Sequence, residues 1–215
     1  RGTKFSSLLL ESHKTYAAEV TLGIQTDTDD AEGEHILSKA ITCSDEEACK
    51  KLLSFLGSSM QQPPIYSALK VQGKPMYKYA REGVKVEKAP RAIEIKTIEN
   101  ISINLPKISF EISCSKGTYI RSIARDLGEL LDCGGHLSAL KRLTQQEFLV
   151  NDAKKIDEIT ELDIIPLEQA FSHLGSVNLP EEKLKKFING STVDLGLSES
   201  GLLRAYNAAG VFIAL

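Results

Sequence analysis

The chain reads KISFEISCSKGTYIRSIARDLGELLDCGG from Lys107 to Gly135, and a change of hydrophobic period within this stretch decides the fold class. Up to Cys114 apolar and polar residues alternate, which is typical of a strand with one buried face. After Lys116-Gly117 the apolar spacing becomes helical, and Gly134-Gly135 ends the helix. The predicted helical stripe consists of Ile120, Ile123, Ala124, Leu127, Leu130 and Leu131.

The segments before this stretch predict further strands and one capped helix. Thr15–Ile24 alternates like a half-buried strand and Ala92–Ile98 resembles another, whereas Asp45–Leu56 has helical spacing. Ser44 and Glu47 form a capping-box pattern at the start of that helix. Short helical patterns follow at Leu137–Leu143 and Asp157–Phe171.

The C-terminal part predicts a small separate unit. Pro180 opens a short helix that Gly190 closes, and Gly201–Leu215 contains two short strands. Strands and helices are mixed without regular βαβ repeats, so we predict an α+β fold with a mostly antiparallel sheet flanked by helices. The predicted domains are residues 1–176 and residues 177–215.

Composition excludes several classes of protein. The 215 residues are 42% hydrophobic and 26% charged, as in an ordinary globular protein, and no apolar run approaches the ~20 residues needed to cross a bilayer. Cys43, Cys49, Cys114 and Cys133 are scattered, with no C-x-x-C pair and no histidine at zinc spacing. We therefore expect reduced thiols in a cytoplasmic protein and no metal.

A basic segment stands out from an otherwise acidic chain. Tyr66–Arg91 contains seven Lys and Arg against two Glu, a charge of +5, so the remainder must carry −8 to give the net −3. Tyr66, Tyr77 and Tyr79 lie among these cations. Cations that neutralise phosphates beside aromatic faces that stack on bases are typical of binding to looped or single-stranded RNA. The alternative is a solvated loop whose tyrosines simply pack.

An acidic loop, TDTDDAEGE, runs from Thr26 to Glu34. Its spacing resembles a calcium loop, but Glu32 occupies the sixth position, where an EF-hand requires glycine. A solvated acidic turn is therefore the default interpretation.

Three long motifs resemble the bacterial tRNA pseudouridine synthases of the TruB family, in the same order. The first is HKTYAAEVTLGIQTDTDDAEGE (His13–Glu34), and the second is QQPPIYSALKVQGKPMYKYAREG (Gln61–Gly83). The third is CSKGTYIRSIARDLGELLDCGGHLSALKRL (Cys114–Leu143). A weaker match continues toward the C-terminus. The form of Gln61–Gly83 is that of the stand-alone bacterial enzymes rather than that of their guide-RNA-dependent relatives.

The resemblance implies a pseudouridine synthase fold with a thumb-like RNA-binding insert at about residues 61–91 and a partial PUA-like C-terminal domain. It implies isomerisation of uridine 55 in the tRNA T-loop, without a cofactor. The partner is the tRNA T-stem-loop; no membrane or obligate protein partner is indicated, and we expect a monomer. The implied RNA-binding residues are Tyr66, Lys70, Lys74, Tyr77, Arg81, Lys85, Arg91, Lys141 and Arg142.

The resemblance also assigns catalytic residues. Tyr16 would stack on the flipped uracil, Tyr119 would assist proton removal at C5, and Arg121 would pair with the catalytic aspartate. The family places the acidic loop beside the active site, so Asp29 or Asp30 would touch RNA or orient partners. From the residues alone, the position of Tyr16 on the apolar face of its strand favours plain core, and Arg121 could be a surface residue on the polar side of its helix.

One departure from the family concerns the nucleophile. The catalytic aspartate of the family lies in a motif close to G-H-T-G-T-L-D-P, which does not occur in this sequence. We therefore expect that the chain has lost its N-terminal segment and part of its C-terminal domain, and that these residues alone are inactive. The alternative is a catalytically dead module that binds and remodels tRNA.

Overall fold

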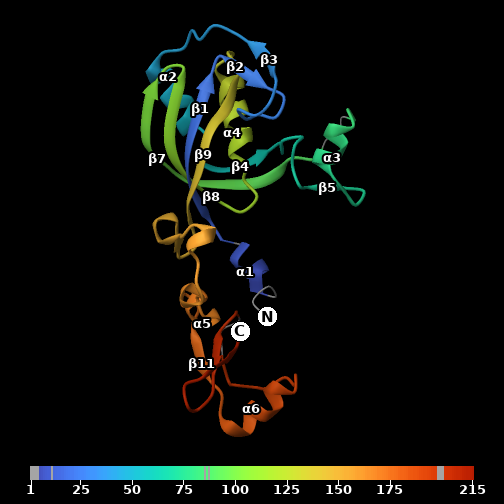
Figure 1. Cartoon of the computed structure of the whole chain (residues 1–215), viewed down its shortest axis with the longest axis vertical. Coiled ribbons are helices and arrows are strands. Elements are labelled where there is room, and N and C mark those ends of the chain that lie inside the picture. The colour runs from blue at the N-terminus through green and yellow to red at the C-terminus, as the bar shows by residue number, and fades with distance from the viewer. Residues whose placement is uncertain (1–4, 11, 85, 87, 198–200) are drawn as a thin grey trace. The chain divides into compact units, whose positions relative to one another are not determined.

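The computed structural model describes residues 5–10, 12–84, 86, 88–197 and 201–215 (Figure 1). They form two compact units, one that ends at Ala153 and one that begins at Lys154. The second unit thus begins before residue 177, the predicted start of the small domain. The predicted domain identities remain predictions.

The first unit is built on a six-stranded sheet in which every neighbouring pair is antiparallel, with the order β10-β9-β1-β8-β7-β4. These strands are β1 (Lys14–Leu22), β4 (Gly57–Gln61), β7 (Arg91–Asn104), β8 (Lys107–Cys114), β9 (Gly135–Gln145) and β10 (Phe148–Leu149). The α+β class with an antiparallel sheet is therefore confirmed.

The central strands confirm the alternating pattern of the sequence. Lys14 pairs with Cys114 and Thr21 with Lys107, so β1 and β8 lie side by side over their whole shared length. The alternate residues of both strands, Ala18, Val20, Leu22, Ile108, Phe110, Ile112 and Cys114, are buried. One face of the sheet therefore forms the floor of the core.

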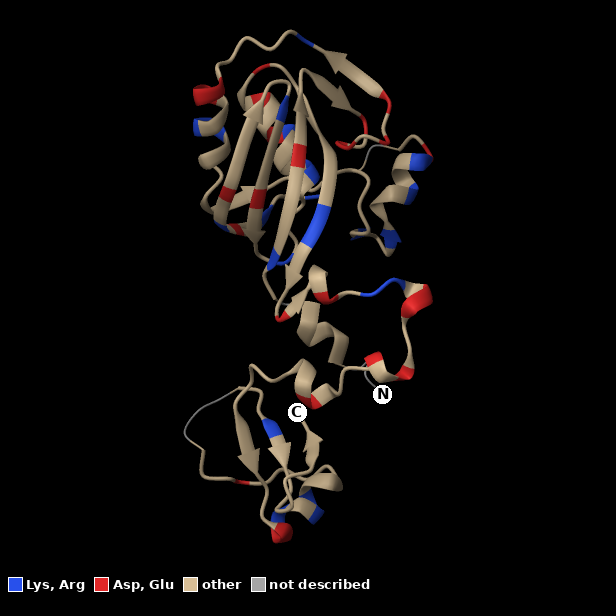
Figure 2. Cartoon of the chain, turned by 60° about the vertical axis from the view of Figure 1, so that its left-hand side comes forward, with Lys and Arg blue, Asp and Glu red and all other residues tan. Residues whose placement is uncertain are grey.

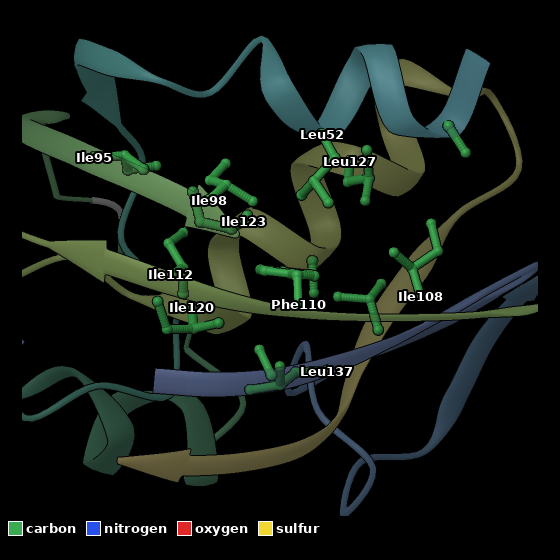
Figure 3. Packing of buried hydrophobic residues seen from close by; sticks show 14 of the residues in the cluster. Leu52, Ile95, Ile98, Ile108, Phe110, Ile112, Ile120, Ile123, Leu127 and Leu137 are labelled. Atoms are coloured by element: carbon green, nitrogen blue, oxygen red, sulfur yellow. The ribbon is translucent and has the colours of Figure 1, made fainter. Parts of the chain in front are cut away.

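Two helices cover that face: α2 (Asp45–Leu53) and α4 (Ile120–Leu130). Figure 3 shows Leu52 of α2 and Leu127 of α4 packed above the sheet, and both side chains are fully buried. Ser44 caps α2 as predicted, because its Oγ accepts a hydrogen bond from the Glu47 amide at 3.2 Å. The prediction that Leu130 belongs to the buried stripe of α4 is wrong, since this residue is 47% exposed.

The predicted helical pattern at residues 137–143 is wrong, because this segment is part of β9. Leu137, Leu140 and Leu143 recur every three residues and imitate a helix, yet Gly135–Gln145 pairs with β1 in the sheet. The backbone groups of β1 on that side need partners, and β9 supplies them. Pairing with a distant strand therefore overrides the local apolar spacing.

Smaller elements surround the sheet. They are α1 (Ser6–Leu10), the ribbon of β2 (Ile24–Thr26) with β3 (His35–Ser38), the ribbon of β5 (Lys70–Val71) with β6 (Lys74–Pro75), and α3 (Met76–Arg81). The segment between β4 and β7, residues 62–90, is called the insert below. It holds β5, β6 and α3. The acidic loop, residues 26–34, runs from the last residue of β2 to the residue before β3.

The second unit contains a three-stranded sheet of β11 (Ser176–Asn178), β12 (Arg204–Tyr206) and β13 (Phe212–Ala214). Its helix α6 (Glu181–Ile188) begins directly after Pro180, which confirms that prediction. The two short strands predicted after Gly201 are confirmed as β12 and β13. The helical pattern over Asp157–Phe171 is mostly wrong, since short 3-10 turns precede a single turn of helix, α5 (Leu167–Ala170).

None of the described helices is long and apolar enough to cross a bilayer. All four cysteines are unpaired.

Candidate active site and RNA-binding surface

The predicted site residues Tyr119 and Arg121 lie where β8 gives way to α4. Tyr119 is the N-cap residue of α4 and has extended backbone angles, φ −101° and ψ 116°. Arg121 and Arg125 follow within the helix, four residues apart, so they lie on one face of it. This face meets the acidic loop and the insert.

Arg121 is held between two segments that are distant in the sequence. Its Nη1 lies 2.9 Å from Oδ2 of Asp30 in the acidic loop, and its Nη2 donates to the carbonyl oxygen of Tyr66 in the insert, also at 2.9 Å. Both side chains of the ion pair are only about a quarter exposed, at 26% and 24%. Arg121 and Asp30, predicted separately as site residues, are therefore in direct contact.

Arg125 forms a second cluster one turn further along α4. Its guanidinium lies 3.1 Å from Oδ2 of Asp29 and 2.7 Å from Oδ1 of Asp126, and it donates to the carbonyl oxygen of Gln62 at 3.1 Å. Burial raises the pKa of Asp29 from its ordinary value of 3.8 to about 6, although Arg125 opposes the shift. Sequence reasoning missed Arg125; its spacing of four residues from Arg121 was the available signal.

The acidic loop is folded against the protein rather than a solvated turn. Asp29 is 7% exposed and has a positive φ of 62°. Thr26 Oγ1 donates to the backbone oxygen of Asp30, and Thr28 Oγ1 donates to its carboxylate, each at 2.6 Å. Backbone bonds between Asp29, Ala31 and Leu137 fasten the loop to β9. The default interpretation is therefore wrong for Asp29 and Asp30.

No metal site accompanies these carboxylates. Within the described part of the chain, no group of three or more His, Cys, Asp or Glu side chains is arranged to hold a metal ion. The acidic side chains instead meet the two arginines of α4.

A hollow of about 340 Å³ lies beside the Arg121–Asp30 pair. Its walls combine that pair with Leu137, Ser138 and Leu140 at the start and middle of β9. An ion pair beside apolar side chains offers fixed polar groups for orienting a ligand and apolar surface for its body, a combination common in small-ligand sites.

Tyr16 lies on β1, opposite Ile112 of β8 and Arg142 of β9. Its ring is half-buried against the core cluster, and the Arg142 guanidinium lies 5.8 Å from the ring centroid. Burial raises the pKa of the Tyr16 hydroxyl, while Arg142 acts in the opposite direction. Tyr16 thus contributes to the core, and its predicted stacking on a base remains a prediction.

Three of the predicted RNA-binding cations, Lys70, Lys74 and Arg81, lie in the described part of the insert. Figure 2 shows Lys and Arg on α3 and Asp and Glu on the loop between β2 and β3. Arg81 lies 5.5 Å from the Tyr77 ring centroid, and Lys74 lies 4.6 Å from that of Tyr79 and also pairs with Glu82. Met76, fully buried, anchors the start of α3. The three cation–aromatic and ion pairs keep these side chains ordered at the surface.

The other predicted RNA-binding residues have varied surroundings. Lys70 is exposed on β5, and Lys141 and Arg142 are exposed on β9, where Arg142 donates to Gln145 at 2.6 Å. Tyr66 is partly buried and gives its carbonyl oxygen to Arg121. Lys85 lies outside the described residues. For all of them RNA binding stays a prediction.

Two residues around Tyr119 had not been predicted to lie there. Gln61, at the end of β4, bonds to both backbone groups of Tyr119, at 2.8 Å and 3.1 Å. The guanidinium of Arg91, at the start of β7, lies 4.7 Å from the Tyr119 ring centroid. Their positions depend on strand pairing, which residue types alone do not reveal.

Comparisons with known proteins agree with this architecture. Residues 1–120 match the family described as TruB family pseudouridylate synthase (N terminal domain). The chain is 39% identical to tRNA pseudouridine synthase B of Alkaliphilus oremlandii over 90% of its own length and 66% of that protein's. It is 38% identical to tRNA pseudouridine synthase B of Thiobacillus denitrificans over its whole length and 74% of that protein's.

Among solved structures, a chain of the "Cbf5-Nop10-Gar1 Complex" superposes with a TM-score of 0.67 at 21% identity, covering 99% of this chain and 61% of that one. This likeness concerns the fold. The chain spans about two thirds of the length of the relatives it matches. With its antiparallel sheet, its Tyr119–Arg121 junction and these matches, the chain belongs to the TruB family of pseudouridylate synthases.

Proposed function

We propose that this chain serves the isomerisation of uridine 55 in the T-loop of tRNA to pseudouridine. The observation that carries the proposal is the position of Arg121, fixed by Asp30 and by the Tyr66 carbonyl beside an open hollow. Two acceptors on one guanidinium fix its plane, which an arginine that orients a catalytic carboxylate requires.

The reaction needs no external reagent. The bond between C1′ and N1 of uridine breaks, the uracil turns and C5 bonds to C1′. C5 then loses its proton to solvent and N1 takes up a proton from solvent. The base must leave the helical stack to be reached. In this proposal Tyr16 receives the flipped base on its ring and Tyr119 assists removal of the C5 proton.

The insert supplies the attraction for the RNA backbone. Lys70 and Arg81 are exposed there, and Lys141 and Arg142 extend the positive charge onto β9. Cations of this kind hold phosphates through a salt-dependent interaction that does not read sequence. The proposed partner is the T-stem-loop of tRNA, and the proposed compartment is the cytoplasm, where the four thiols stay reduced.

The nucleophile is the missing part of the reaction. Because the aspartate motif of the family does not occur in residues 1–215, we propose that these residues alone bind tRNA without forming pseudouridine. The same observation favours a second candidate, a tRNA-binding module without catalysis. An in-frame G-T-L-D-P motif upstream in the coding sequence would exclude this second candidate.

Release of tritium from a T-stem-loop labelled at C5 of uridine tests both candidates. A protein that carries the aspartate motif together with residues 1–215 is expected to release tritium, and residues 1–215 alone are expected to release none. Turnover by residues 1–215 alone would contradict the proposed need for that aspartate. If the longer protein also releases no tritium, the second candidate, a tRNA-binding module without catalysis, is the function that remains.

Tyr16 provides a second test in the longer protein that carries the aspartate motif, called the active protein below. Tyr16→Ala is expected to reduce turnover by on the order of 100-fold with little change in RNA affinity, since a lost stacking face misplaces the base. Tyr16→Phe keeps the ring and is the matched control. Equal losses of affinity and turnover in Tyr16→Ala would assign Tyr16 to packing.

A further inference from the structure

The insert leaves and rejoins the sheet at a single cross-strand pair. Gln61 is the last residue of β4 and Arg91 the first of β7, and they are register partners in the antiparallel ladder. Residues 62–90 therefore emerge between these two side chains. Both side chains reach the loop that ends in Tyr119.

The Gln61 side chain forms hydrogen bonds with both the amide and the carbonyl of Tyr119. Its Oε1 accepts a hydrogen bond from the Tyr119 amide at 2.8 Å, and its Nε2 donates to the Tyr119 carbonyl at 3.1 Å. The residue is 2% exposed, so water does not compete for these bonds. A carboxamide carries a donor and an acceptor together and can therefore satisfy both groups of one residue, as a neighbouring strand would.

Arg91 contacts the side chain of Tyr119, since its guanidinium lies over the aromatic ring. Its guanidinium carbon lies 4.7 Å from the Tyr119 ring centroid, and its Nη2 donates to the carbonyl oxygen of Gly117. Gly117 has a φ of +81°, and a Cβ there would come within 3.2 Å of the Arg91 guanidinium carbon. Glycine at this position thus permits both the turn and the approach of the arginine.

We propose that Gln61 and Arg91 are positioning residues that together fix Tyr119, Gln61 by its backbone and Arg91 by its ring. The inference rests on the proposed role of Tyr119 and adds the means by which that tyrosine is oriented. It also gives Arg91 a role other than neutralising a phosphate, because its guanidinium already lies over an aromatic ring and donates to a backbone oxygen. The root of the insert is then part of the active-site scaffold.

Amide hydrogen exchange in residues 1–215, without RNA, tests the Gln61 half. Gln61→Met keeps the side-chain length but removes both bonds, so the Tyr119 amide is expected to lose protection about tenfold while the Leu127 amide in α4 is unchanged. Gln62→Met is the matched control, since the Gln62 side chain donates to Lys88 instead.

Gln61→Glu covers the case in which Gln61→Met perturbs the fold as a whole. Its carboxyl keeps an acceptor for the Tyr119 amide and, when protonated, a donor for the carbonyl. Protection is therefore expected to be retained under acidic conditions and to fall once the buried carboxylate ionises. Unchanged exchange of Tyr119 in Gln61→Met would overturn the proposal. So would equal acceleration in the Gln62→Met control.

Turnover and salt dependence in the active protein test the Arg91 half. Arg91→Met is expected to lower turnover about tenfold and leave the salt slope of RNA binding unchanged. Arg91→Lys is expected to lose less turnover, because its ammonium can still lie over the Tyr119 ring. A slope that falls by about one with unchanged turnover would overturn the proposal and assign Arg91 to a phosphate. Absence of turnover in the unaltered protein would refute the proposed function, whereas the exchange experiment would still decide the Gln61 half.

Discussion

The acidic loop and the insert are both irregular, both flank α4 and carry opposite charge, yet they are built differently. The acidic loop turns two of its charges inward, since Asp29 is 7% exposed and Asp29 and Asp30 each meet an arginine of α4, whereas Glu32 and Glu34 are exposed. The insert exposes Lys70, Lys78 and Arg81, and among its described residues only two prolines, Ser67 and Met76 are buried. The sign of a loop's charge therefore does not reveal whether its charged side chains are exposed to solvent or packed against the rest of the protein.

The difference follows from where the neutralising groups lie. The helix α4 offers two arginines to the acidic loop, and burying a carboxylate is tolerable only beside such a partner. Within the insert the cations outnumber the acidic side chains, so most remain at the surface, where a polyanion can reach them. We expect substitutions in the acidic loop to affect turnover and stability, and substitutions in the insert to affect RNA affinity.

The largest expected effect is on turnover at the boundary between the two regions. In the active protein Arg121→Lys is expected to reduce turnover on the order of 100- to 1000-fold, because one ammonium cannot hold both Asp30 and the Tyr66 carbonyl in a fixed plane. Tritium release and RNA affinity measured together provide the check. Asp30→Asn is expected to reduce turnover to a similar extent. If Arg121→Lys lowered RNA affinity but not turnover, Arg121 would serve only to hold the insert.

The next effect concerns pH and the buried Asp29. With its pKa raised to about 6, folded Asp29 keeps a proton that the unfolded chain has released above pH of about 4, so its contribution to stability falls as pH rises through this window. The loss amounts to about 3 kcal/mol. Asp29→Asn should remove it, which urea unfolding at pH of about 4 and about 7 can measure. Identical pH dependence in both proteins would contradict this account.

A matched pair of glycines compares the packing of the two regions. A Cβ on Gly33 would collide with Thr28 and Asp27 inside the acidic loop, whereas a Cβ on Gly83 in the insert meets nothing within 4 Å. Gly33→Ala is therefore expected to lower the free energy of unfolding by about 2 kcal/mol. Gly83→Ala, strained only by its φ of +71°, should cost about 1 kcal/mol. Equal costs in urea unfolding would mean that the two regions are packed alike.

The smallest expected effect is on RNA affinity at one cation. Lys70→Glu or Arg81→Glu in the insert should lower the salt slope of tRNA binding by about one while stability changes by less than about 0.5 kcal/mol. Lys50→Glu on α2 makes the same change of net charge away from the insert and is the matched control. A slope that falls equally in the control would show that the protein's net charge, not the insert, attracts the RNA.

Much of the scaffold could be predicted from the sequence because its elements are locally consistent. The alternation of Lys107–Cys114, the cap at Ser44 and the stripe of α4 each agree with their tertiary surroundings. Residues 137–143 could not be predicted, since their apolar spacing imitates a helix while their state is set by pairing with β1. Tertiary pairing decides such segments.

The site was predictable only in parts. Arg121 and Asp30 could each be named through the family motifs, but their ion pair joins residues 91 positions apart and follows from the fold. The buried Arg125–Asp29 cluster had no motif of its own, and Gln61 and Arg91 reach Tyr119 only because strand register brings them there. Side-chain types indicated the chemistry, and chain topology determined which groups meet.

The bonds that attach the insert to α4 have a consequence for how this protein can change. Arg121, Ser122 and Arg125 all donate to backbone oxygens of the insert, those of Tyr66 and Gln62. A carbonyl oxygen is the same in every residue, so these attachments do not depend on which side chains the insert carries. The insert can therefore exchange its surface residues, in evolution or by grafting, and adapt to a different RNA while the helix that bears Arg121 keeps its support.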